Sequence, residues 1–262
     1  MLRKGDLTQG GITGTLLHFT LPMMMGAFLQ QCYNIADTLI VGQCIGSGAL
    51  AAVGSAYTLM VFLISVLLGL AMGSGTVFSL HYGAGNPVVL RRSIFSSFVL
   101  IGIVTLILNV AVFIWLDPIL RLLQVPQDIY GMMRSYLWII FCGIVFTFIY
   151  NFYAALLRAV GDSVTPLWFL AVSVVLNIAL DLFFILQLDW GIQGAATATV
   201  LAQGVAALGI LIHTYKGRPE LRWHYEDMCF DRICLKEIAS FSTLTCVQQS
   251  VMNLGILMIQ GL

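Results

Sequence analysis

Two aspartates, Asp37 and Asp181, lie in long stretches of apolar residues that otherwise suit a lipid bilayer. A charged side chain at the bilayer centre costs about 2.5–3.5 kcal/mol on insertion scales, so acids in membrane helices commonly mark a path for an ion or a substrate. A carboxylate can bind a metal cation, or it can take up a proton when it is removed from water. The two residues therefore predict a site that binds an ion or a proton.

Asn177 precedes Asp181 by four residues, so a helix places both side chains on one face, about 6 Å apart along its axis. An amide oxygen beside a carboxylate offers the hard oxygen ligands that small cations prefer. Thr199, in the next apolar segment, adds a hydroxyl to this set. The same residues also suit a structural polar clamp between helices. The pattern leaves the choice between Na⁺ and H⁺ open.

The apolar segment around Asp37 carries two more polar residues, Gln30 and Asn34, at spacings that put all three on one helix face. The two amides fit a substrate cavity, or they form hydrogen bonds between helices, as polar residues do in any membrane bundle. Pro22 lies in the same segment and removes one backbone donor. We expect a bend at this proline, either as a static kink or as a hinge.

A further polar face is predicted in segment 131–156. It comprises Tyr136, Gly143, Thr147, Tyr150 and Asn151, which recur at helical spacing if the segment is one helix. Aromatic and amide groups that line a cavity suit a large, flat organic ligand. The alternative is an interfacial tyrosine together with bundle packing.

Composition sets the class of protein. Hydrophobic residues make up 60% of the chain and charged residues only 9%, whereas a soluble domain carries about 25% charged residues. We expect an all-α, polytopic membrane protein. A net charge of +0 without a basic cluster indicates no nucleic-acid partner, and the six cysteines show no metal-ligand spacing, so no cofactor is expected beyond the coupling ion.

Seven apolar segments are each long enough to cross a bilayer. They are 15–41, 50–80, 93–116, 131–156, 165–186, 192–214 and 237–262. With the N-terminus in the cytoplasm, all of the 12 basic residues except Arg121 and Arg134 fall on the inner side. This bias predicts a multi-pass protein of the cell membrane with a cytoplasmic N-terminus.

The charged break before the last segment suggests a division of the chain. We predict a six-helix lobe at 1–215, a cytoplasmic linker at 216–236 and the first helix of a second lobe at 237–262. Gln30 and Gln31 are echoed by Gln248 and Gln249, as in a repeated unit. The chain stops at Leu262 without a polar tail, so a truncated second lobe is expected.

Several motifs of the chain occur together in one family of transporters. They are Leu21-Pro22, Gln30-Gln31-Cys32-Tyr33-Asn34-Ile35-Ala36-Asp37-Thr38, Val41-Gly42, Leu50-Ala51-Ala52-Val53-Gly54, Ala155-Leu156-Leu157-Arg158-Ala159-Val160-Gly161-Asp162, Thr165-Pro166, Asn177-Ile178-Ala179-Leu180-Asp181 and Gly194-Ala195-Ala196-Thr197-Ala198-Thr199. In order and spacing, the chain resembles the N-terminal portion of the MATE (multidrug and toxic compound extrusion) transporters from about Gly11 to Leu262.

The resemblance implies two six-helix lobes in an outward-open V, with efflux of cationic drugs against inward Na⁺ or H⁺. It implies an ion or proton site at the positions of Asp37, Asn177, Asp181 and Thr199. Bending at the position of Pro22 is a proposed step in that family, and the positions of Tyr136 and Asn151 lie near the cavity. The family has about twelve helices, so the expected partner is a missing C-terminal lobe, without which the chain should not transport. Gly255 stands where the second lobe would repeat Asp37.

We therefore predict a secondary antiporter, not an enzyme, that exports amphipathic and often cationic compounds in exchange for Na⁺ or H⁺. A lipid-linked saccharide flippase is an alternative, but it calls for a more cationic interior than these acids provide. An intramembrane aspartyl protease also uses two membrane aspartates. Its Tyr-Asp and Gly-x-Gly-Asp motifs are missing, because Asp37 follows Ala36 and Asp181 follows Leu180.

Overall fold

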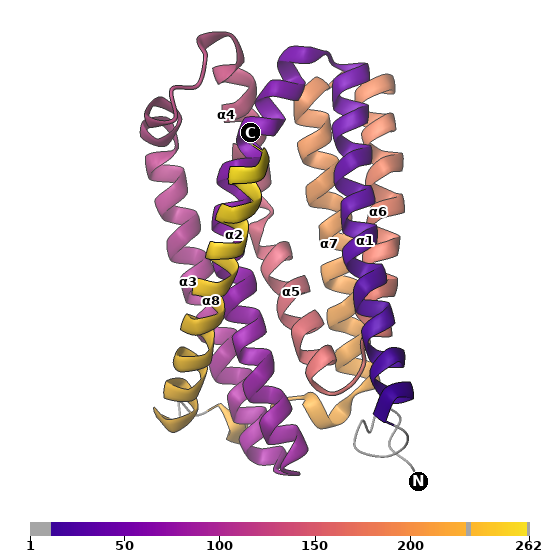
Figure 1. Ribbon diagram of the computed structural model, residues 1–262, viewed down its shortest axis with the longest axis vertical. Helices are drawn as coiled ribbons and strands as arrows, with labels where there is room; N and C mark the ends of the chain where they lie inside the picture. Colours follow the sequence, from indigo (N-terminus) through magenta and orange to yellow (C-terminus); the bar gives the residue numbers. More distant parts are fainter. Residues whose placement is uncertain (1–11, 229–231, 261–262) are drawn as a thin grey trace.

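The computed structural model describes residues 12–228 and 232–260, and within these ranges the chain is helical and has no strands. The helices are α1 Ile12–Cys44, α2 Ser47–Gly83, α3 Pro87–Leu122, α4 Gln127–Cys142, α5 Ile144–Ala159, α6 Val164–Leu182, the π-helical turn η1 Phe183–Gln187, α7 Gly191–Gly217, the short 3₁₀ helices η2 Pro219–Leu221 and η3 Tyr225–Asp227, and α8 Arg232–Gln260. The long helices run side by side in one bundle (Figure 1). This confirms the all-α class. The basic residues Arg3 and Lys4 lie outside the described residues.

One predicted helix is in fact two. Segment 131–156 is divided at Gly143 into α4 and α5, which are bent by 48° relative to each other. A Cβ atom at Gly143 would lie 2.5 Å from Cγ2 of Val200, so the side chain of Val200 in α7 occupies the space beside the break. The expectation that Tyr136 shares one helix face with Thr147, Tyr150 and Asn151 is therefore wrong, because Tyr136 belongs to α4.

Membrane-spanning character is concentrated in the middle of the chain. Among the described residues, four helices are long and apolar enough to cross a membrane, and the bent pair α4–α5 is a fifth if it counts as one span. The four are α2, α3, α6 with its π-helical turn, and α7. The sequence predicts seven such segments, and the difference lies in α1 and α8. Both are long, but their polar residues lower their hydropathy, and in α1 these include Asn34 and Asp37.

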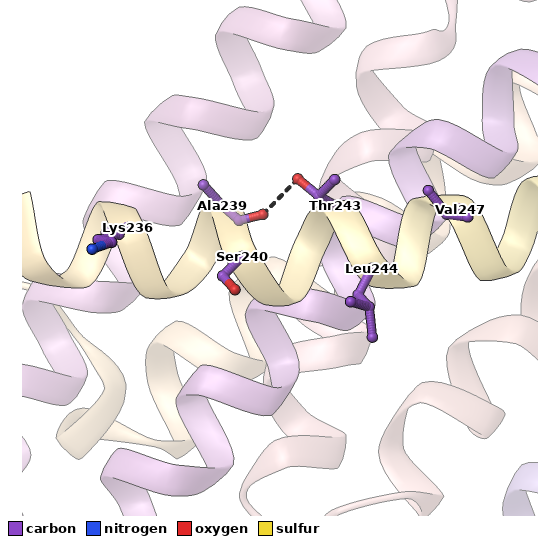
Figure 2. Close-up of a pocket in the computed structure, with 6 residues that line it drawn as sticks. All are labelled: Lys236, Ala239, Ser240, Thr243, Leu244 and Val247. Carbon is purple, nitrogen blue, oxygen red and sulfur yellow. Dashed lines mark hydrogen bonds between the residues drawn. The ribbon is translucent and has the colours of Figure 1, made fainter.

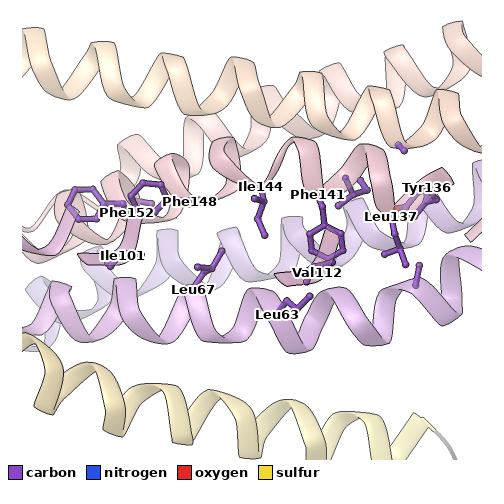
Figure 3. Close-up of a cluster of buried hydrophobic side chains, with 14 of the residues drawn as sticks. Leu63, Leu67, Ile101, Val112, Tyr136, Leu137, Phe141, Ile144, Phe148 and Phe152 are labelled. Carbon is purple, nitrogen blue, oxygen red and sulfur yellow. The ribbon is translucent and has the colours of Figure 1, made fainter. Parts of the chain in front are cut away.

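The apolar core lies between α2, α3, α4 and α5. Phe152 of α5 contacts Phe78 of α2 and Phe98 of α3 at ring centroid distances of 5.9 and 5.3 Å. Figure 3 shows the same row of buried side chains continuing through Phe148 and Ile144 to α4. These contacts fix α4 and α5 against the rest of the bundle, although the backbone is interrupted between them.

Helix α8 packs along α2 through small residues (Figure 1). A Cβ atom at Gly73 would lie 2.4 Å from Cα of Ser242, so only glycine allows this approach of the two backbones. The Ser242 hydroxyl donates to the Leu70 carbonyl at 3.4 Å. Close contact through glycine and serine is the usual means of helix association in a bilayer.

The predicted linker 216–236 packs against the bundle. Leu221 is buried, and Trp223 contacts Phe95 and Phe98 of α3 at 6.1 and 5.5 Å. Asp227 accepts a hydrogen bond from Nε of Arg91, also in α3, at 2.7 Å. Helix α7 ends at Gly217 and α8 begins at Arg232, so the interval between these two helices is shorter than the predicted linker. The division into two lobes stays a prediction.

Candidate functional site

The two intramembrane aspartates meet inside the bundle, although 144 positions separate them in the sequence (181 − 37). Asp37 of α1 is 8% exposed and Asp181 of α6 is fully buried. Their carboxyl groups are close enough to interact as hydrogen-bonding partners, which requires one of them to carry a proton. The Oδ1 atom of each lies buried without a hydrogen-bond partner. Two buried acceptors in one place need either a proton or a cation.

Asn177 and Thr199 complete the predicted group. The Asn177 side-chain nitrogen lies 3.3 Å from Oγ1 of Thr199. When the amide is turned so that both of its ends are satisfied, Nδ2 donates to Oδ2 of Asp181 at 3.0 Å and Oδ1 accepts from the Thr199 backbone N–H at 3.3 Å. The structure thus brings together all four residues of the predicted ion site, from α1, α6 and α7.

Tyr33 is a member of this group that the sequence reasoning missed. Its hydroxyl lies 3.3 Å from Oγ1 of Thr199 and so joins α1 to α7. The available signal was spacing, because Tyr33 precedes Asp37 by four residues and shares its helix face. Tyr136 of α4 is buried beside the group, within electrostatic range of both aspartates and Tyr33. Two phenols therefore flank the carboxyl pair.

A π-helical turn follows directly after the Asp181 side of the group. Residues 183–187 form η1, and the backbone N–H of Trp190 then donates to the Phe184 carbonyl at 3.1 Å. The rings of Phe184 and Trp190 stack at 5.1 Å, and Gly194 of α7 packs against Phe184. This tight connection between α6 and α7 keeps Asn177 and Asp181 facing Thr199. Single π turns recur at functional sites.

The other predicted cavity residues, on α5, form hydrogen bonds with different partners. Thr147 donates to Oε1 of Gln203 across α5 and α7, and Asn151 donates to the Thr147 carbonyl at 2.8 Å. The Tyr150 hydroxyl donates to the Pro166 carbonyl at 3.0 Å. Gln203 was also missed, although it follows Thr199 by four residues and lies on the same face of α7.

The first-helix amides lie apart from the carboxyl pair. Gln30 is exposed, and Nδ2 of Asn34 donates to Oε1 of Gln31 at 3.1 Å on the helix surface. Pro22 is half-buried within α1, which continues as one helix through it. A hinge at Pro22 stays a prediction.

Two surface hollows lie away from the carboxyl pair. One, of about 570 Å³, runs along α8 and is lined by Lys236, Ala239, Ser240, Thr243, Leu244 and Val247 (Figure 2). The other, of about 490 Å³, is at the end of α7 and is lined by Gly209, Ile212, His213, Lys216 and Gly217. Neither includes a residue of the predicted ion site.

Chemically, the group of Asp37, Asp181, Asn177 and Thr199 is an acceptor-rich site inside an apolar bundle. In the described part of the chain, no Lys, Arg or His takes part in the interactions of the two carboxyl groups. The site can therefore hold one positive charge that comes from outside the protein. A proton shared between the carboxyls and a small cation bound by their free oxygens both meet this requirement.

Comparisons with known proteins agree on one group of relatives. The model of the MatE family matches residues 22–183. The chain is 37% identical over 215 residues to the probable multidrug resistance protein YpnP of Bacillus subtilis (strain 168), covering 82% of this chain and 48% of YpnP. It is 31% identical over 206 residues to the multidrug export protein MepA of Staphylococcus saprophyticus, covering 76% of this chain and 44% of MepA.

A solved structure shows the same arrangement of helices. It is described as the outward-facing conformation of a multidrug resistance MATE family transporter of the MOP superfamily. It matches with a TM-score of 0.91 at 25% identity, covering 98% of this chain and 57% of that chain. The chain thus spans about half the length of the curated relatives that it matches.

Proposed function

The chain belongs to the MatE family of transporters, and from this premise we propose that it forms the ion-coupling lobe of a secondary antiporter. The antiporter exports amphipathic, often cationic compounds in exchange for inward H⁺ or Na⁺. It lies in the cell membrane with its N-terminus in the cytoplasm, and a second lobe completes the pathway. The relatives named for multidrug export and resistance support this proposal.

The observation that carries the proposal is the carboxyl pair. Asp37 and Asp181 are buried together, and each has one oxygen without a partner. Two adjacent buried acids cannot both be ionised at low cost unless a cation lies between them. Binding of H⁺ or Na⁺ therefore neutralises the pair, and release of the ion restores negative charge inside the lobe.

Exchange follows from this competition for charge. The ion favours the lobe arrangement in which the pair is neutral, and a cationic substrate favours the arrangement in which the pair is ionised. A ligand shifts a conformational equilibrium only by its differential affinity for the two states. Two ligands with opposite demands on the same carboxyls are therefore coupled, and a gradient of one drives the other uphill.

The acidic character of the site also favours cationic substrates. A positive group near two carboxylates gains Coulomb energy that a neutral analogue does not, and the gain is larger inside an apolar bundle than in water. The phenols of Tyr33 and Tyr136 beside the pair add ring faces that attract organic cations. A lipid-linked diphosphate would meet only negative charge here.

The test is efflux of a fluorescent organic cation from proteoliposomes that contain the complete polypeptide, under a Na⁺ gradient or a pH gradient applied separately. We expect one gradient to drive efflux in the wild type and neither to do so in Asp181→Asn. Asp189→Asn is the matched control, because it removes an exposed loop acid at φ 52°, a backbone conformation that asparagine tolerates. Efflux that survives in Asp181→Asn would refute coupling at this pair. Absence of efflux in the wild type would favour transport of a different substrate class.

A further inference from the structure

A continuous apolar stripe runs the length of α7 on the side away from the carboxyl pair. Its side chains recur at steps of four, three, four and three residues, so they lie on one face of the helix. They are Leu201, Val205, Leu208, Ile212 and Tyr215, which are 46–58% exposed. Helix α7 is one of the membrane-spanning candidates, so this face contacts the hydrocarbon of the bilayer.

The hollow of about 490 Å³ lies where this stripe reaches the end of the helix. It is lined by residues of α7 alone. Phe169 of α6 packs against two of them, Gly209 and His213. A Cβ atom at Gly209 would lie 2.5 Å from the Phe169 ring, and that ring also contacts His213 edge-on at 5.9 Å. The hollow thus lies on α7, beside its contact with α6, and it includes the apolar side chain of Ile212.

A histidine and a lysine border the other side of the hollow. His213 and Lys216 are three residues apart, on one face of the last turns of α7. Nearby basic residues have partners, since Arg218 pairs with Asp162 at 3.4 Å and with Glu220 at 3.6 Å. Within residues 12–228 and 232–260, neither His213 nor Lys216 takes part in an ion pair. Lys216 is therefore available to an external anion at the boundary of the membrane.

We propose that this hollow binds one anionic phospholipid. Its phosphate lies between His213 and Lys216, and one acyl chain follows the stripe from Ile212 towards Leu201. Charge complementarity selects an anionic lipid, and the apolar stripe selects a lipid over a free phosphate. The hollow on α8 differs, because the hydroxyl side chains of Ser240 and Thr243 line it.

Such a lipid would have a consequence for the carboxyl site. It would bind to α7 beside the contact between Phe169 of α6 and Gly209, and these two helices also carry Asp181 and Thr199. Membrane composition would then influence how firmly the two helices are held together. The inference does not depend on the proposed antiport, because it concerns a different face of the bundle.

The test is native mass spectrometry of the purified protein in detergent micelles, titrated with phosphatidylglycerol or with phosphatidylcholine of the same acyl chains. We expect one tightly retained phosphatidylglycerol and weaker retention of phosphatidylcholine. Lys216→Gln should weaken phosphatidylglycerol binding about fivefold, as expected for loss of one basic residue at a membrane surface. Lys236→Gln is the matched control, since it removes the same charge from the hollow on α8.

Three outcomes would overturn the proposal. One is equal retention of the two lipids by the wild type. Another is an equal loss in Lys216→Gln and Lys236→Gln, which would indicate diffuse attraction to positive charge. The third is displacement of the bound lipid by inorganic phosphate, which would indicate a phosphate site without a role for the acyl chain. Thermal unfolding of Lys216→Gln distinguishes a lost ligand from a damaged helix end.

Discussion

The buried acids of this protein fall into two regions with opposite surroundings. Asp227, in the segment between α7 and α8, is 3% exposed, and it accepts hydrogen bonds from Nε of Arg91 at 2.7 Å and from the His224 backbone N–H at 3.0 Å. Asp37 and Asp181 are buried to a similar degree, but they face each other and have no basic partner in the described chain.

The contrast distinguishes a structural acid from one that is open to an external charge. Burial alone would raise the pKa of Asp227, but the hydrogen bonds from the His224 backbone and from Arg91 outweigh it and hold that pKa below its ordinary value. Asp227 is therefore a fixed anion whose counter-charge belongs to the protein. The carboxyl pair has no such counter-charge within the described chain. The positive charge that neutralises it must therefore be an external proton or cation that binds and dissociates.

The largest expected effect is in Asp181→Asn. Removing one of two adjacent acids should abolish binding of the coupling ion, without lowering the melting temperature, because only one buried group that can carry a negative charge is left. The measurement is uptake of protons by the protein in lipid nanodiscs as the pH is lowered, with and without Na⁺, read with a pH-sensitive dye in weak buffer. Unchanged proton uptake under both conditions, or a large loss of stability, would place Asp181 with Asp227 as a structural acid.

Arg91→Met should show the reverse pattern. It leaves Asp227 buried without its counter-charge, and we expect a loss of about 1.5–3 kcal/mol in the free energy of unfolding, with ion binding unchanged. The double variant Arg91→Met/Asp227→Leu should regain most of this stability, because no buried charge is left unpaired. Denaturant unfolding in detergent measures both. No recovery in the double variant would show that Arg91 acts through packing.

Tyr33→Phe should have a smaller effect, confined to the carboxyl region. It removes the hydroxyl that lies 3.3 Å from Oγ1 of Thr199, a hydrogen bond worth about 0.5–1.5 kcal/mol. We expect a few-fold change in the concentration of ion that half-saturates the site, and Tyr82→Phe on α2 serves as the control. An identical affinity in Tyr33→Phe and the wild type would remove Tyr33 from the site.

The smallest effect concerns acid stability. The pKa of Asp227 is lowered in the folded state, so its contribution is fully present above its unfolded pKa of about 3.9. That contribution is lost as the pH falls through the folded value. Asp227→Asn should therefore lack this part of the acid dependence between about pH 5 and the acid limit of folding. Parallel stability curves for the two proteins would contradict the assignment.

Local spacing made much of the site predictable from the sequence. Asn177 and Asp181 lie on one face because they are four residues apart in a helix. Asp37 was predicted as an acid in an apolar segment, and Thr199 as a hydroxyl in the segment after Asp181. The break at Gly143 could not be predicted in this way. It depends on Val200, 57 positions further along the chain (200 − 143), which fills the space beside the glycine.

The linker shows the same limit. Its charges suggested a cytoplasmic linker between two lobes, and the sequence did not show that Leu221, Trp223 and Asp227 pack against the bundle. Residue types identify which side chains can make such contacts, while their partners depend on how distant helices come together. Tyr33 and Gln203 could have been predicted from the sequence. Each lies four residues from a predicted site residue, Asp37 or Thr199, and so on the same helix face.

The glycine-lined contact between α2 and α8 can form only after α8 has been synthesised, long after α2. Ser242 and Leu70 are separated by 172 positions, and a ribosome adds about 5–20 residues per second. The face of α2 that carries Gly69 and Gly73 is therefore synthesised roughly 10–30 s before its partner helix α8. During that interval lipid or an insertion chaperone must cover this face of α2. A substitution there would therefore affect the nascent chain before its synthesis is complete.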